Sequence, residues 1–114
     1  MALNNTALNV MAEALRTAAG YLALHSADPG TTGTNPTSAA RVGAAWPAAS
    51  GSGDLIISNK SFTGGAANGA ATYVGLWSAA VGGTFYGAFP LTGDVAFNSA
   101  GEYTIGSLTI DGAS

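Results

Sequence analysis

The residues closest to a catalytic pattern are His25, Ser26 and Asp28, which supply within four positions the three residue types of a serine-hydrolase triad. A triad needs its nucleophile, base and orienting acid to converge from three directions, whereas neighbours at the end of a strand point to opposite faces. The G-x-S-x-G turn of α/β-hydrolases is also missing from the sequence. We therefore predict structural roles, with His25 bonded to backbone and Asp28 closing a turn through its side chain.

The remaining polar residues do not indicate a second kind of active site. The sequence gives no reason to select a carboxylate pair for hydrolysis, because all acidic residues but Glu13 stand beside turns or expected strand ends. The glycine clusters 51–53 and 64–69 lack the spacing and the following lysine of a phosphate loop. With no cysteine, one histidine and no calcium-loop motif, the sequence predicts no catalytic residue, no metal and no cofactor.

Charge is scarce along the whole chain. Only 8% of the 114 residues are charged, where a globular domain usually carries about a quarter, and the net charge is -3. The three cations, Arg16, Arg41 and Lys60, are too few for the basic track that binds phosphates, which excludes nucleic acid as a partner. No apolar run reaches the roughly 20 residues that cross a bilayer, so we expect no membrane insertion.

Aromatic side chains and one turn are the remaining interaction candidates. Exposed aromatic rings stack on sugars, although such residues more often anchor a core or a subunit interface. The turn is Asp28-Pro29-Gly30, in which proline presets φ and glycine accepts a positive φ. Tyr103 belongs to the same class of aromatic residue. The predicted interaction residues are Tyr73, Trp77, Trp46, Tyr86, Asp28, Pro29 and Gly30.

The sequence predicts a helix, a strand, a long loop and a β-rich body, in that order, to position these residues. Apolar residues recur at helical spacing over about residues 6–19, with Asn4, Asn5 or Thr6 available as the N-cap. Residues 20–25 read as a first strand, and 26–40 as a long polar loop that stays mobile unless the domain or a partner pins it. Residues 41–110 form a β-rich body, so we expect one domain over 1–114.

The β-rich body contains several short runs with a period of two. Residues 72–78 and 84–89 predict a hairpin, and the runs 41–46, 54–58 and 95–97, with a further short run at Phe62, predict other strands. In the last run, 102–110, the apolar phase slips at Gly106-Ser107, which requires a bulge or a bend. About seven short strands and one N-terminal helix predict a mainly β, single-domain β-sandwich or jelly-roll-like fold.

Two segments are distinctive when they occur together. They are residues 24–33 (L-H-S-A-D-P-G-T-T-G) and 74–78 (V-G-L-W-S) with the downstream run 82–85 (G-G-T-F). Arg41, Trp46 and the run P-L-T at 90–92 accompany them. With these motifs, about residues 5 to 110 resemble the small tail-fibre-like virion proteins of tailed bacteriophages, particularly those infecting actinobacteria, often called minor tail proteins. Residues 34–40 depart from the pattern, because they are polar and short of aromatic side chains.

The resemblance implies a non-enzymatic structural protein of the virion, assembled in the cytoplasm of the host bacterium. A minor tail protein at the tail tip or a fibre is the favoured role; head decoration and a glycan- or receptor-binding module are the alternatives. The sparse charge agrees, because small uncharged residues pack against neighbours without desolvating ions. We expect a homo-oligomer, a trimer, bound to other tail or capsid proteins, with host cell-surface glycan as a further partner.

Overall fold

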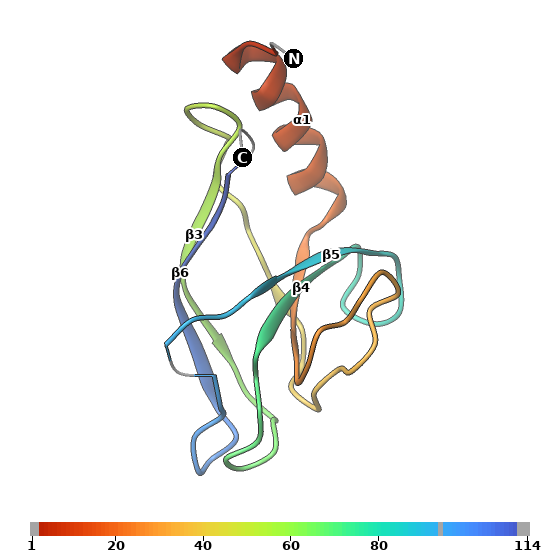
Figure 1. Cartoon of the computed structure of the whole chain (residues 1–114), viewed down its shortest axis with the longest axis vertical. Coiled ribbons are helices and arrows are strands. Elements are labelled where there is room, and N and C mark those ends of the chain that lie inside the picture. The colour runs from red at the N-terminus through yellow and green to blue at the C-terminus, as the bar shows by residue number, and fades with distance from the viewer. Residues whose placement is uncertain (1–2, 94, 112–114) are drawn as a thin grey trace.

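The chain forms two β-sheets with a helix at one end (Figure 1). This computed structural model describes residues 3–93 and 95–111. Its elements in chain order are α1 (Asn5–Ala18), β1 (Tyr21–His25), β2 (Val42–Gly43), β3 (Leu55–Phe62), β4 (Tyr73–Trp77), β5 (Phe85–Pro90) and β6 (Tyr103–Ile110). The prediction of a mainly β fold with one N-terminal helix is therefore confirmed.

Helix α1 extends from the sheets at one end of the long axis of the molecule (Figure 1). The side chain of Asn4 accepts a hydrogen bond from the backbone N–H of Ala7 at 2.9 Å, which caps the first turn. Ala12 is the one helix residue that is fully buried. Within the described chain, no helix is long and apolar enough to cross a membrane.

A polar clasp on the last turns of α1, formed by Glu13 and Arg16, holds the helix to the body. The two side chains form a salt bridge of 2.7 Å. Arg16 also donates to the backbone carbonyl of Trp46 at 3.0 Å, and Glu13 accepts from the backbone N–H of Ala49 at 2.7 Å. Because the helix buries so little apolar surface, these bonds to the segment after β2 contribute to its orientation.

The first sheet is antiparallel and has the strand order β2-β1-β4-β5. Strand β1 lies inside this sheet and is buried on both faces from Leu22 to His25, as predicted. Strands β4 and β5 form the predicted hairpin, with one register irregularity between Leu76 and Trp77. The sheet therefore has one face toward the core and another toward the loop of residues 26–40.

The second sheet is the two-stranded ribbon of β3 and β6 (Figure 1). Its pairing runs from Leu55–Ile110 to Phe62–Tyr103 without an inserted residue. Both strands nevertheless change their buried face in the middle, where Asn59 adopts a left-handed φ of 56° between the paired positions of β3. The predicted phase slip of β6 is thus real, and the partner strand shares it, so no bulge is needed.

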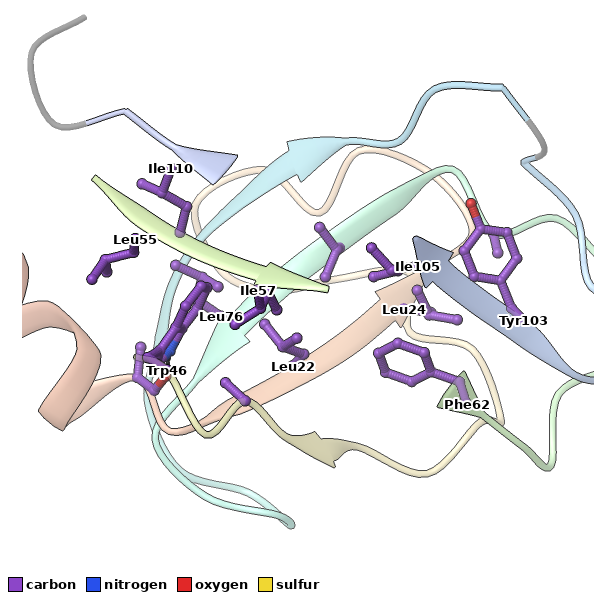
Figure 2. Close-up of a cluster of buried hydrophobic side chains, with 14 of the residues drawn as sticks. Leu22, Leu24, Trp46, Leu55, Ile57, Phe62, Leu76, Tyr103, Ile105 and Ile110 are labelled. Atoms are coloured by element: carbon purple, nitrogen blue, oxygen red, sulfur yellow. Dashed lines mark hydrogen bonds between the residues drawn. The ribbon is translucent and has the colours of Figure 1, made fainter. Parts of the chain in front are cut away.

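The hydrophobic core lies between the two sheets, and Figure 2 shows side chains of both sheets meeting in it. The first sheet contributes Leu22, Leu24, Val74 and Leu76, and the ribbon contributes Leu55, Ile57, Phe62, Tyr103, Ile105 and Ile110. Trp46 joins this core next to the helix, and its indole Nε1–H donates to the backbone carbonyl of Ala19 at 2.9 Å. One continuous cluster therefore supports both sheets.

The strand boundaries differ from the sequence predictions in three places. The run 41–46 yields only β2, because Ala45 takes a left-handed φ of 48° before Pro47. The run 95–97 forms a single bridge, between Ala70 and Ala96, rather than a strand. The runs 54–58 and Phe62 are one strand, β3. The described chain thus has six strands where about seven were predicted.

Candidate interaction surface

The two distinctive sequence motifs meet on the outer face of the first sheet. Ala23 pairs with Gly75 and Tyr21 with Trp77, so alternate residues of β1 and β4 place His25, Gly75 and Trp77 on one face. The loop of residues 26–40 returns across this face. We call the six residues that meet there the motif cluster: His25, Gly33, Arg41, Gly75, Trp77 and Phe85.

His25 is the polar centre of the motif cluster and is 0% exposed. Its Nδ1 lies 2.8 Å from the carbonyl oxygen of Thr34, which can only accept, so Nδ1 carries the proton. Its Nε2 then accepts from the indole N–H of Trp77 at 3.4 Å, and the two rings stack with a 6.2 Å centroid separation. Both ring nitrogens are therefore used within the fold.

The neighbours of His25 in the sequence do not complete a catalytic triad. The hydroxyl of Ser26 donates to the carbonyl of Asn35 at 3.4 Å. The carboxylate of Asp28 accepts from the backbone N–H of Gly30 at 2.9 Å, which closes the turn. The predicted structural roles of His25 and Asp28 are confirmed, and within the described ranges no three metal-ligating side chains gather.

The pKa of His25 is lowered chiefly by burial, and the positive charge of Arg41 lowers it further, although the carbonyl of Thr34 acts in the opposite direction. A second proton on the ring would also place an N–H of His25 against the N–H of Trp77. The neutral ring is thus part of the folded state.

We expect acid to destabilise the fold through His25. The unfolded ring takes up a proton near its ordinary pKa of 6.5, whereas the folded ring does so only at lower pH. Stability is therefore fully present above that value and falls as the pH decreases toward the lowered folded pKa. Urea unfolding at about pH 7.5 and about pH 5.5 measures the difference. His25→Asn should remove this pH dependence, since the chain has one histidine. If the free energy of unfolding changes equally with pH in both proteins, the dependence does not come from His25.

Trp77 is packed by its own chain on several sides. The ring of Phe85 lies 5.2 Å away between centroids, and the guanidinium of Arg41 lies 3.9 Å from the Trp77 ring centroid. Arg41 also donates to the carbonyls of Ala79 and Gly82 at 2.8 and 2.7 Å. Arg41 therefore ties the β4–β5 turn to the indole, and Trp77 is half-buried.

Glycine is required at two positions of the motif cluster. A Cβ on Gly75 would lie 2.5 Å from Nε2 of His25, and a Cβ on Gly33 would lie 2.6 Å from the Trp77 ring. Gly33 also has a φ of 79°, which side chains other than glycine rarely adopt. The glycines of the two motifs thus make room for the aromatic residue of the other motif.

The loop of residues 26–40 is pinned by the body of the domain. The backbone N–H of Ser26 donates to Asn35, and that of Thr37 donates to Leu24, at 2.9 and 3.1 Å. Pro29 is fully buried, whereas Asp28 and Gly30 are exposed. Of the predicted turn, only these two residues are available to a partner.

The predicted aromatic residues do not form one exposed set. Trp46 is 6% exposed and belongs to the core. Tyr73 is half-buried beside His25, its pair on β1. Tyr86 is 46% exposed and lies on β5, next to Phe85 of the motif cluster. Of the predicted interaction residues, Tyr86, Asp28 and Gly30 are therefore exposed, Tyr73 and Trp77 are half-buried, and Trp46 and Pro29 are buried.

Part of the exposed apolar surface lies on α1 and was missed by the sequence prediction. On α1, Val10 is 66% and Met11 is 58% exposed. A groove of about 260 Å³ lies between the helix and the near end of the ribbon. Its lining residues are Leu8, Met11, Ala12, Leu15, Gly53, Leu55 and Ile110. Helical spacing predicted that Met11 shares one face of the helix with Leu8 and Leu15. It could not predict how much of that face the rest of the domain leaves exposed.

Further hollows adjoin the ribbon, and two of them involve β6. One, of about 380 Å³, is polar and lies at the end away from the helix, lined by residues that include Glu102, Asn98 and Thr104. The other, of about 260 Å³, follows β6, with Pro90, Leu91 and Thr92 on its other side.

Comparison with known proteins identifies a family. A model of the family described as Podophage GP4 fiber I protein gp80 matches residues 2–111. No curated protein and no solved structure matches the chain. Because the family match spans nearly the whole sequence and includes both motifs, the chain belongs to this phage fibre family.

Proposed function

We propose that this phage fibre protein is a minor tail component, at the tail tip or in a fibre, that works as an assembly of copies and catalyses no reaction. Membership of a fibre family makes it a structural component associated with the virion. Self-assembly is supported by a surface that is poor in charge and carries the exposed apolar residues Val10 and Met11 beside an apolar groove. Sparse charge and exposed apolar side chains both favour association.

The observation that carries this proposal is the open apolar end of α1. Of the helix residues, Ala12 is buried and Leu15 packs partly buried against the core, whereas Val10 and Met11 are exposed. A helix needs a packed apolar face to be stable, because a 14-residue helix is marginal in water by itself. A neighbouring subunit that covers Met11 and the groove would supply this packing.

Localisation and mass measurements test the proposal together. Antibody labelling of intact particles should place the chain on the tail, and light scattering of the purified chain should give a mass of two or more copies. Labelling of the head alone contradicts the tail role, and a monomer at all concentrations contradicts self-assembly. The expected three copies, the host-glycan contact and the likeness to phages of actinobacteria stay predictions.

A further inference from the structure

The ring of His25 links two segments of the motif cluster. Its Nδ1–H donates to the carbonyl of Thr34 in the loop of residues 26–40, and its Nε2 accepts from the indole N–H of Trp77 on β4. The rings of His25 and Trp77 also stack, with 10° between their planes. A single buried side chain therefore connects the loop to β4.

A proton added to this ring affects its two contacts in opposite ways. The proton goes to Nε2, since Nδ1 already carries one, and the ring then has two donors and no acceptor. The bond from Nδ1–H to Thr34 is strengthened by the charge. The contact with Trp77 is lost, because two N–H groups then face each other. Acid therefore favours the link to the loop and breaks the link to β4.

The charges and dipoles around His25 divide in the same way. Burial has the largest effect on the pKa of His25 and lowers it, and the positive charge of Arg41, whose guanidinium lies over the Trp77 ring, lowers it further. The backbone carbonyls of Thr34 and Asn35 raise this pKa. The groups that stabilise a charged ring thus lie in the loop, and the charge that opposes it lies beside Trp77.

No acidic side chain compensates a positive charge on His25. Beside the ring on β4 and β5 lie Tyr73, Trp77 and Phe85, which are uncharged. In the loop, the carboxylate of Asp28 closes its own turn. Within the described residues, no carboxylate forms a hydrogen bond with the ring. A protonated ring therefore needs water, which reaches it once the indole moves away.

The core between the sheets does not depend on this contact. Leu24 and Val74, which pair across β1 and β4, point toward the core, whereas His25 and Trp77 point to the opposite face. Trp77 is also half-buried at the rim of the cluster. Its indole can therefore turn toward solvent without separating the strands.

We propose that His25 and Trp77 form an acid switch, in which protonation of His25 releases the Trp77 indole to solvent while the loop stays bound through Thr34 and both sheets stay folded. Trp77 is one of the interaction residues predicted from the sequence. A contact made through its indole would therefore form in acid and not at neutral pH. The motif cluster shares no residue with the groove beside α1, so this inference is independent of the proposed self-assembly.

The population of the released form should follow the protonation of His25. With the indole released, the ring is hydrated and titrates near its ordinary pKa of 6.5, whereas the packed ring takes up a proton only at lower pH. The ratio of released to packed Trp77 should therefore rise by up to about tenfold for each pH unit below 6.5, until the lowered pKa of the packed ring is reached.

Fluorine NMR of the chain labelled with 5-fluorotryptophan tests the switch, because the chain has two tryptophans. Trp46→Phe and Trp77→Phe assign the two signals. Between about pH 7.5 and about pH 5, the Trp77 signal should move toward its position in the unfolded chain, whereas the signal of Trp46, in the core, should stay. His25→Asn should abolish the movement. Joint movement of both signals means global unfolding and overturns the switch, as does a Trp77 signal that does not move or that still moves in His25→Asn.

Trp77→Phe tests the same contact without requiring the released form. Phenylalanine keeps a ring beside His25 but has no N–H to oppose the proton. The pKa of His25, measured from the pH dependence of its ring C–H signals, should rise toward 6.5 in this variant. Tyr86→Phe, which removes an exposed hydroxyl from β5, is the control and should leave the pKa as it is. If Trp77→Phe also leaves it as it is, the indole does not oppose the proton and the proposal fails.

Discussion

Replacing Trp46 by alanine is expected to lower the free energy of unfolding by about 3–5 kcal/mol, the usual range for a buried large aromatic residue. The indole is buried next to the helix end of the core, and its N–H satisfies the carbonyl of Ala19 directly after α1. The substitution removes both the packing and the bond. Urea unfolding, with unchanged slope against denaturant, measures the loss.

Trp46→Phe is the matched control for this prediction. It keeps most of the ring and leaves the Ala19 carbonyl without its donor, so we expect a smaller loss of about 1–3 kcal/mol. If Trp46→Ala left stability unchanged and abolished association instead, Trp46 would belong to an interface. That result would support the prediction from the sequence that Trp46 is an interaction residue.

Replacing Gly33 by alanine is expected to break the contact between the loop of residues 26–40 and the ring of Trp77. The left-handed φ of 79° disfavours any side chain, by about 1–2 kcal/mol, and the added methyl group would overlap the indole, typically costing a further ~1–3 kcal/mol. We expect lower stability, a red shift of tryptophan fluorescence and faster proteolysis within the loop. These three measurements report the fold, the indole environment and the loop separately.

Gly30→Ala is the matched control for Gly33→Ala. Gly30 has a similar φ of 63° in the same loop, but its added Cβ would meet open space. It should therefore show the conformational cost alone, without the fluorescence shift. Equal effects of the two substitutions would mean that the contact with Trp77 does not hold the loop.

Local patterns predicted those parts of the fold that depend on neighbouring residues. The hairpin of β4 and β5 follows from two β-rich runs joined by a short glycine-containing turn, and α1 follows from its apolar period. The slip at Gly106 was also visible, because Tyr103 and Leu108 stand in opposite phase. Each of these signals lies within one continuous stretch of sequence.

The motif cluster could not be predicted, because it depends on contacts between segments far apart in the chain. The ring of His25 meets Trp77, 52 positions later, and Gly33 meets the same indole. The polarity of residues 26–40 predicted a loop that stays mobile unless the domain or a partner pins it, but not which of these holds; backbone bonds to β1 and a buried Pro29 hold it to the domain. The motifs that carried the family resemblance are thus two halves of one packing arrangement.

The clasp at the base of α1 has a mechanical consequence. The molecule is 45 Å long and 26 Å across at most, and the helix stands at one end of that length (Figure 1). If tension is applied along the long axis, it passes from helix to sheets through Gly20, which lies between α1 and β1, through the bonds of Glu13 and Arg16, and through the bond of Trp46 to Ala19. These few bonds would break before the paired strands are sheared apart. The helix would therefore detach under a lower force than the sheets need to unfold.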